Sequence, residues 1–228
     1  MIRQRTKAHA PTVGRRRSSA DPGGREALLD AAIKLFAERG IANTTVAQIA
    51  AAGRVTPAMV HYWFDTRGKL QDAIVDERIA PLMRDVWMSA DAAQDDVVTL
   101  VRGLVSRMLD VTEQAAWLPS LWLREIVQEG GLLRERMLKR VPIDRVAAFR
   151  TTVARAQKEG RVHAGVAPEL VFLSLLALVM LPQAVARTWQ RLNPEATIDR
   201  ARLERHVLTL LIEGLVVQRS RKPTRSRT

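Results

Sequence analysis

Hydrophobic residues recur along most of this chain at intervals of three and four, the spacing of amphipathic α-helices. Between residues 25 and 39 these positions are Leu29, Ala32, Ile33 and Phe36, and Gly40 follows where a left-handed residue favours a helix end. Breaks rich in glycine, proline and asparagine separate further helical stretches near 67–88, 94–114, 116–129, 131–140, 143–159, 167–192 and 199–218. No stretch has a convincing strand pattern, so we expect an all-α fold.

The stretch 45–64, TVAQIAAAGRVTPAMVHYWF, predicts two short helices joined by a tight turn. Thr45 and Gln48 form a T-x-x-Q capping box, which satisfies free N–H groups at the start of the first helix. Thr56 is a natural N-cap of the second helix, and Pro57 fits its first turn, where no N–H is needed. Such a pair can place side chains against base edges in a major groove, although a hairpin packing on a partner protein has the same pattern.

The second helix of this motif has two different faces. Val60 and Phe64 are four residues apart and point inward, while the opposite face is too aromatic for an ordinary solvated surface. Apolar atoms there can meet thymine methyl groups, the Tyr62 hydroxyl can reach a base edge or phosphate, and Arg67 can reach the backbone. The expected DNA-binding residues are Thr45, Gln48, Thr56, Pro57, Ala58, Met59, His61, Tyr62, Trp63 and Arg67.

Charge is concentrated at the two ends of the 228-residue chain. Of a net charge of +12, six basic residues lie in 1–20 and five in 218–228, with no acid in either, which leaves 25 basic and 24 acidic residues between them. Both runs lack apolar content, so we expect disordered tails at 1–23 and 219–228. For residues 3–17 a solvated tail and a DNA-seeking arm are equally open; the second run is expected to be solvated.

Composition excludes several classes of protein. The chain has no cysteine, so it has no disulfide framework and no thiolate metal site. The basic start is not followed by an apolar segment, and the longest uncharged run falls short of the roughly 20 residues of a spanning helix, so we expect a cytoplasmic protein with no membrane partner.

Residues 25 to about 75 resemble the DNA-binding domain of the TetR family of bacterial transcriptional regulators. Ala32 and Phe36 match its first helix, 44–50 its TT-V-x-x-IA run, 55–64 its V-S/T run with closing aromatics, and Arg67 and Leu70 the start of its fourth helix. The resemblance implies a three-helix DNA-binding domain at 24–84 and a helical domain at 85–218 that binds a ligand and forms a dimer.

Three positions depart from the family pattern. Arg54 occupies a turn position where glycine is usual, so it must accept a left-handed conformation, at a cost of about 1 kcal/mol, or reshape the turn. His61 stands where tyrosine is commonest, and Trp63 where histidine or tyrosine is usual. We interpret these changes as an altered sequence preference.

The last two helical stretches predict self-association. The 167–192 stretch is apolar nearly all round and the 199–218 stretch carries an apolar stripe, and one subunit offers little chain to cover both. A second copy would supply the cover as a four-helix interface, with burial inside one subunit as the alternative. The expected interface residues are Leu176, Val179, Leu203, Val207, Leu211 and Leu215.

A small-molecule site is expected in the second domain, with Trp87, Trp117 and Trp122 as candidate lining residues, although each could be plain core. No common catalytic or nucleotide-binding motif is present, and Glu125 and Glu129 are expected on a solvated face rather than around a metal. We therefore expect no enzyme and no cofactor.

The predicted function is a homodimeric repressor that binds an inverted-repeat operator in double-stranded DNA and is released by a small-molecule effector. A constitutive DNA-binding protein and a helical interaction module are the alternatives.

Overall fold

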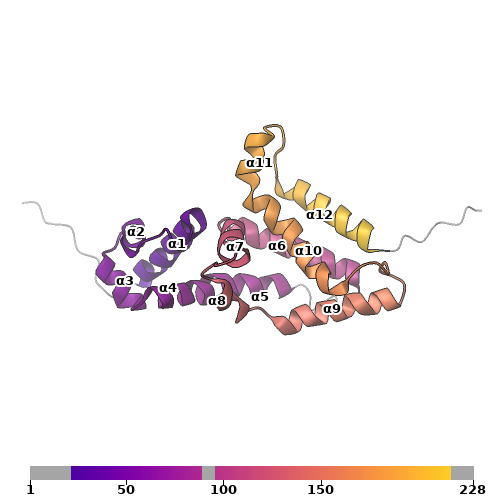
Figure 1. Cartoon of the computed structure of the whole chain (residues 1–228), viewed down its shortest axis with the longest axis horizontal. Coiled ribbons are helices and arrows are strands. Elements are labelled where there is room, and N and C mark those ends of the chain that lie inside the picture. The colour runs from indigo at the N-terminus through magenta and orange to yellow at the C-terminus, as the bar shows by residue number, and fades with distance from the viewer. Residues whose placement is uncertain (1–21, 89–95, 217–228) are drawn as a thin grey trace, which may run out of the picture.

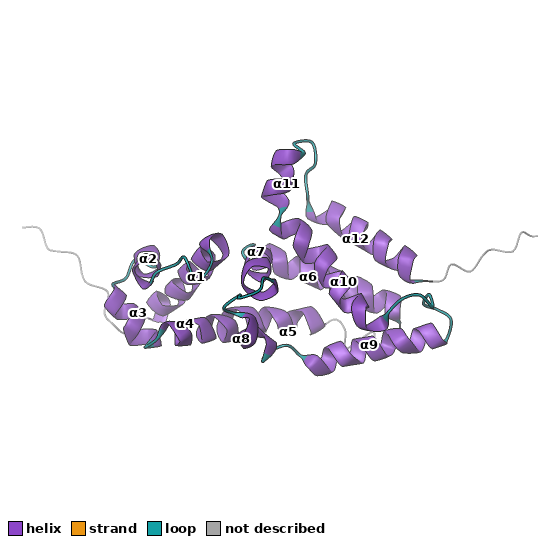
Figure 2. Cartoon of the chain, viewed as in Figure 1, coloured by secondary structure: helices purple, strands orange, loops and turns teal. Residues whose placement is uncertain are grey.

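The structure, a computed structural model, describes residues 22–88 and 96–216, and these form helices joined by loops (Figures 1 and 2). The predicted all-α class is confirmed, since the only β pairing in these two ranges is an isolated bridge between Val162 and Val216. The helices, with two π-helical turns named η1 and η2, are α1 (Pro22–Arg39), α2 (Val46–Ala52), α3 (Pro57–Phe64), α4 (Arg67–Ile74), η1 (Val75–Ile79), α5 (Ala80–Met88), α6 (Val97–Gln114), α7 (Leu118–Trp122), η2 (Leu123–Val127), α8 (Arg134–Leu138), α9 (Ile143–Lys158), α10 (Pro168–Ala184), α11 (Ala186–Leu192) and α12 (Arg200–Leu215).

The first three helices form the head of the molecule (residues 22–66), which lies at one end in Figure 1. Its core is built on the predicted positions Leu29, Ile33 and Phe36 of α1, together with Ile49 of α2 and Leu70 of α4, all at most 1% exposed. Three fully or largely buried side chains from the region of α7 and α8 join the same cluster: Leu121, Leu133 and Met137. The head therefore shares its core with residues far along the chain.

A stem (residues 67–88) runs from the head into the rest of the molecule as α4, η1 and α5 without a break. Pro81 cannot donate a hydrogen bond, and in an α-helix its ring would clash with the carbonyl four residues earlier. The turn before it is widened, and the Ala80 amide bonds to the Val75 carbonyl five residues back. The stem thus accommodates Pro81 by a π-helical turn and remains continuous.

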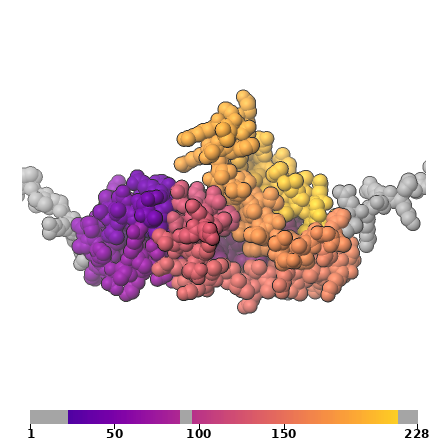
Figure 3. Space-filling model, viewed as in Figure 1, coloured from indigo at the N-terminus to yellow at the C-terminus, as the bar shows by residue number. Residues whose placement is uncertain are grey.

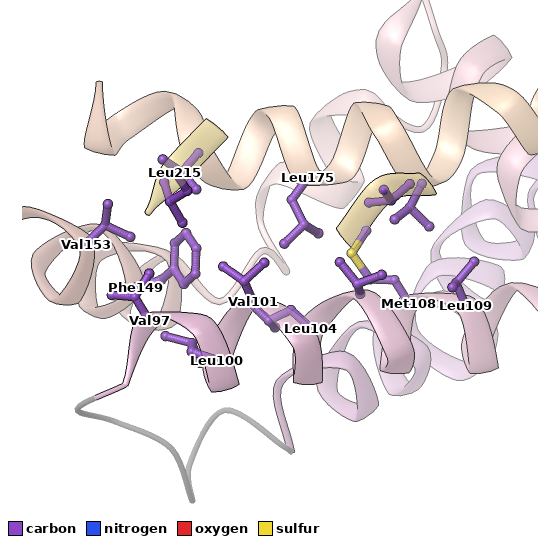
Figure 4. Close-up of a cluster of buried hydrophobic side chains, with 14 of the residues drawn as sticks. Val97, Leu100, Val101, Leu104, Met108, Leu109, Phe149, Val153, Leu175 and Leu215 are labelled. Carbon is purple, nitrogen blue, oxygen red and sulfur yellow. The ribbon is translucent and has the colours of Figure 1, made fainter. Parts of the chain in front are cut away.

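The body (residues 96–216) surrounds a second apolar core. In Figure 4, Val101, Leu104 and Met108 of α6 face Leu175 of α10, and Phe149 of α9 closes one end. The predicted 167–192 helix is two helices, because α10 and α11 meet at 62°. Pro182 precedes this bend, and α11, which has no buried residue, stands out from the body (Figures 1 and 3).

Among the described helices, no single one is long and apolar enough to cross a membrane, and α10 with α11 meets that length and composition only as a bent pair. The predicted tails lie outside the described residues, except that the first one overlaps the start of α1 at residues 22 and 23. The predicted boundary between residues 84 and 85 falls inside α5.

Candidate DNA interface and ligand cavity

The predicted capping box is confirmed at the start of α2. The Thr45 hydroxyl accepts a hydrogen bond from the Gln48 amide at 3.2 Å, and the Gln48 side chain accepts one from the Thr45 amide at 2.8 Å. Both side chains are exposed, so the cap that starts the helix also lies at its surface. Ile49 and Ala50 bury the opposite face against α1.

The turn between α2 and α3 accepts a left-handed residue at Arg54, whose φ is 57°. Of the two conformations expected for Arg54, the structure therefore has the left-handed one, and its side chain is exposed. The turn lies close to α1, because a Cβ on Gly53 would come within 2.8 Å of Leu28 Cδ1. Thr56 is the N-cap residue of α3 as predicted, but its hydroxyl makes no capping bond and is exposed.

One face of α3 is anchored and the other is open. Val60 and Phe64 are 3% and 4% exposed, whereas Tyr62 is 68% exposed. Pro57, Ala58 and His61 are also exposed, and Met59 is half-buried. The structure therefore brings the predicted reading residues together on one surface of a helix fixed from behind.

Trp63 and His61 have partners within the chain. The Trp63 ring is half-buried and packs over Gly24 of α1, where an added Cβ would lie 3.0 Å from the ring. The His61 ring nitrogen Nδ1 lies 3.1 Å from the Asp65 carbonyl oxygen. Trp63 thus fixes α3 to α1 more than it offers a free surface.

Arg67 has protein partners in place of the expected phosphate. Its guanidinium donates hydrogen bonds to the carbonyls of Ile41 and Thr44, the latter at 2.7 Å, in the loop that precedes α2. The Nε atom of Arg67 is buried as well. This arrangement gives Arg67 a role in holding the loop before α2, through the single nitrogen Nη2 that makes both bonds.

Ion pairs join the stem to the head on one side and to the body on the other. Arg78 of η1 donates to Glu26 at 2.5 Å and to Asp30 at 2.8 Å, both in α1. On the other side, Arg136 of α8 pairs with Asp72, and Arg140, two residues after α8, pairs with Asp76, each with a contact of 2.7 Å. Charged pairs therefore hold η1 to the head on one side, and hold α4 and η1 to the body on the other.

Glu125 is buried, at 5% exposure, which corrects the expectation of a solvated face. One carboxylate oxygen accepts a hydrogen bond from the Ile41 amide at 2.8 Å, and the other accepts one from the Leu132 amide at 3.2 Å. Glu129, four residues on, is exposed as expected. The i, i+4 spacing does not distinguish the two residues, because the partners of Glu125 are backbone amides, which have no side-chain pattern in the sequence.

The body contains a cavity of about 400 Å³ between the stem and helices α6 to α10. Its wall is almost wholly apolar, with Thr112 and Glu169 as the polar side chains among the described lining residues. The Thr112 hydroxyl is turned to the Leu109 carbonyl at 2.9 Å. The main apolar lining residues are Met83, Val86, Trp87, Met108, Val111, Trp122, Ile126, Phe172, Leu176 and Met180.

Two of the three tryptophans predicted for a ligand site line this cavity. Trp87 is stacked on Phe172 at 5.0 Å between ring centroids and meets Phe149 edge-on at 6.5 Å. Trp122 lies across the cavity on α7, but Trp117 does not line it and packs against the shared core of the head. Phe172 was missed because one aromatic residue in an apolar helix carries no sequence signal of a cavity.

Four of the six residues predicted for a dimer interface lie in the core of one subunit: Val179, Leu203, Val207 and Leu215, each at most 6% exposed. This is a correction, since α10 and α12 pack on each other and on α6 within the subunit. Leu176 and Leu211 are half-buried at the edge of that core. The large exposed leucines of these helices are Leu170, Leu173, Leu181 and Leu210.

Comparison with known proteins identifies a sequence pattern in the head and the start of the stem. Residues 28–74 match the model of the tetR family of bacterial regulatory proteins. The HTH-type transcriptional regulator BetI of Brucella suis biovar 1 is 33% identical over 102 residues, or 43% of this chain and 52% of BetI. The alignment thus spans about half the length of this curated relative.

Solved structures resemble the chain over most of its length. KstR2 of Mycobacterium tuberculosis, a ketosteroid transcriptional regulator, has a TM-score of 0.67 at 15% identity and covers 89% of this chain and 100% of its own. AibR, solved with isovaleryl coenzyme A and operator DNA, has a TM-score of 0.62 at 20% identity and covers 83% of this chain and 98% of its own. At these identities the likeness concerns the fold. Residues 28–74 thus carry the sequence pattern of the tetR family of bacterial regulatory proteins, and the chain as a whole has the fold of the solved regulators KstR2 and AibR.

Proposed function

We propose that this protein is a sequence-specific DNA-binding regulator of transcription, a repressor that a small molecule releases from its operator. The observation that carries the proposal is the exposed face of α3 around Tyr62, on a helix whose other face is buried at Val60 and Phe64. A surface held rigidly in this way can read bases in a major groove without losing much conformational freedom on binding.

Within this proposal, Pro57, Ala58 and Met59 meet thymine methyl groups, and Tyr62 reaches a base edge or phosphate. Thr45, Gln48, Thr56 and His61 surround this face and contact the DNA backbone. Arg54 joins them, because it is an exposed cation in the turn directly before α3. Arg67 is left out, since its guanidinium is engaged by the Ile41 and Thr44 carbonyls.

The proposed effector is a largely apolar small molecule that occupies the 400 Å³ cavity. Aromatic and methionine side chains adapt to flat or branched hydrocarbon, and a wall with so few polar groups favours a ligand with few of its own. The crystal structure of AibR, which has the same fold, contains both isovaleryl coenzyme A and operator DNA. A cytoplasmic location accords with this role.

The proposed assembly is a homodimer through the outer faces of α10 and α12. Leu170 and Leu181 on α10 are each about half exposed, at 53% and 46%, and Leu210 on α12 is 50% exposed. Burying such leucines is a strong driving force for association. A two-fold dimer would place two α3 helices about 34–36 Å apart, so the operator is expected to be an inverted repeat.

The test is to select duplexes from a random pool with the purified protein and to measure their affinity at several salt concentrations. We expect an inverted repeat bound much more tightly than scrambled duplex. Selection of no consensus would overturn the DNA-reading function and favour a helical interaction module. Affinity that no apolar metabolite changes would instead favour a constitutive DNA-binding protein.

A further inference from the structure

We propose that Glu125 is the positioning residue through which a ligand in the cavity shifts α2 and α3, the two helices of the DNA-binding motif. The inference rests on the proposed function, since it concerns how a ligand in the cavity changes the head. It assigns that link to one buried carboxylate and to the loop between α1 and α2.

Glu125 lies on a short segment with two different sides. Trp122 directly precedes η2, and Ile126 lies within it, and both side chains line the cavity. Glu125, between them in sequence, is buried on the side of the head, where it accepts the Ile41 amide at 2.8 Å. A ligand that displaces Trp122 or Ile126 therefore moves the residue that holds Ile41.

The backbone of Ile41 is hydrogen-bonded through both its N–H and its carbonyl. Its N–H donates to Glu125 of the body, and its carbonyl accepts from Arg67 at the start of the stem. The Ile41 side chain is fully buried in the shared core. Gly40 beside it has a φ of 82°, and a Cβ there would lie 3.3 Å from the Glu125 carboxylate, so the loop and the carboxylate are in close contact.

The loop between α1 and α2 connects Ile41 to the start of α2. Thr44 bonds back to the Gly40 carbonyl through its hydroxyl at 2.7 Å, and its own carbonyl accepts from Arg67 at 2.7 Å. Thr45, the next residue, makes the capping box that starts α2. A shift at Ile41 therefore changes where α2 begins, and α3 packs on α2.

A buried carboxylate makes this connection stiff. Glu125 has two described hydrogen-bond donors, the amides of Ile41 and Leu132, and loss of either would leave a buried carboxyl oxygen without a donor. The head must therefore follow η2 when η2 moves. In Figures 1 and 3 the segment around α7 and α8 lies between the head and the rest of the body, as this role requires.

The link is separable from the attachment of the head to the body. The pairs Arg136–Asp72 and Arg140–Asp76 join α8 and the residues just after it to the stem independently of Glu125. Leu121 and Leu133 stay in the shared core. Replacing Glu125 should therefore uncouple the cavity from the head without detaching the two.

The experiment uses the full chain, a duplex selected from a random pool, and N-phenyl-1-naphthylamine, a neutral apolar fluorophore, as the probe. Energy transfer from the cavity tryptophans reports its binding. Duplex affinity is measured with and without saturating probe in the parent, in Glu125→Ala, in Glu125→Gln and in the matched control Glu129→Gln. Circular dichroism of each variant checks its folding.

In the parent and in Glu129→Gln we expect the probe to weaken duplex binding by about 5- to 150-fold. In Glu125→Ala we expect the probe to change duplex affinity by less than about twofold, while the affinity of the free protein for the probe is unchanged. Glu125→Gln, which retains one acceptor, should fall between them and serves if the alanine variant does not fold. Probe binding should also change hydrogen exchange at the Ile41 amide in the parent. It should not do so in the Glu125 variants.

The two ways of failing are distinct. A parent whose duplex affinity ignores bound probe would overturn ligand-responsive regulation, and with it this inference. A parent that responds while both Glu125 variants respond equally would overturn only the role of Glu125. An Ile41 amide whose exchange is unaffected by the probe in the parent would have the same meaning.

Discussion

Arg25, near the start of α1, donates two hydrogen bonds to the carboxylate of Glu77 in η1, at 2.7 and 2.6 Å. The same guanidinium lies 5.0 Å from the centroid of the Phe64 ring, at the end of α3. One side chain thus joins the first helix, the reading helix and the wide turn of the stem. The hydrogen bond from Arg25 is the main reason why the pKa of Glu77 lies below its ordinary value of 4.5.

This pair predicts a pH dependence. Because the folded-state pKa of Glu77 is lowered, the pair stabilises the fold above the unfolded-state pKa, and that stability is lost as the pH falls through the lowered value. The pair is about one-third exposed, so Glu77→Gln should cost only about 0.5–1 kcal/mol at neutral pH. Urea unfolding of parent and variant should show this difference shrink below pH 4.5. Glu38→Gln, an exposed change in α1, should show no such trend.

Tyr62 should carry part of the sequence preference. Tyr62→Ala removes an exposed ring and hydroxyl from the centre of the reading face, and we expect it to cost about 1–3 kcal/mol of operator binding and to blur the selected consensus. Tyr62→Phe keeps the ring and isolates the hydroxyl. A Tyr62→Ala variant that binds the same consensus with parental affinity would mean that DNA contacts a different face.

Arg54 should trade stability for DNA affinity. Arg54→Gly relieves a left-handed conformation, so we expect the fold to gain about 1 kcal/mol. The same change removes a proposed phosphate contact, so the salt dependence of duplex binding should fall by about one unit for all sequences. Thermal unfolding and binding at several salt concentrations measure the two effects, and an unchanged salt slope would remove Arg54 from the interface.

Arg67 should matter for stability, not for phosphate contact. Arg67→Ala takes a donor from the Thr44 carbonyl and one of two from the Ile41 carbonyl, which also accepts from the Thr44 amide. We expect a loss of about 1–3 kcal/mol in urea unfolding, with no change in the salt slope of duplex binding. Arg67→Lys should be intermediate, because both bonds come from the single nitrogen Nη2, and an ammonium on a shorter side chain would reach the two carbonyls less well. A lower salt slope at parental stability would restore Arg67 as a DNA contact.

The outer leucines should control assembly. Leu181→Glu combined with Leu210→Glu places charges on exposed positions of α10 and α12, so we expect folded monomers that bind single half-sites weakly. Leu215→Glu serves as a contrast, because that residue is 4% exposed and the change should unfold the body. Sedimentation distinguishes these outcomes, and a parent that is monomeric at micromolar concentration would contradict the proposed dimer.

Local patterns predicted the head well. The T-x-x-Q box, Pro57 in a first turn and the i, i+4 pair Val60 and Phe64 each report interactions within a few residues, and each was found where expected. The exposed side of α3 follows from the buried side, so the position of Tyr62 could be predicted as well. Arg67 could not, because its partners, the Ile41 and Thr44 carbonyls, have no side-chain signature.

The body was less predictable because its helices are apolar on several sides. Val179 and Val207 have the same character as exposed leucines on α10 and α12, and only the packing of three helices decides which ones face inward. The bend at residue 185 and the burial of Glu125 likewise depend on neighbours far along the chain. Hydrophobic periodicity says that a face is covered, but not by what.

The shared core around Phe36 bears on how such proteins can be recombined. Leu121, Leu133 and Met137 fill the space under α1 and α4, so a head cut out at the stem would expose that apolar surface. In a chimera that joins this head to another regulator's body at one crossover in the stem, α1 and α4 would therefore pack against side chains that do not match them. Functional hybrids should need two exchanged segments, the N-terminal stretch and residues 117–138, transplanted together.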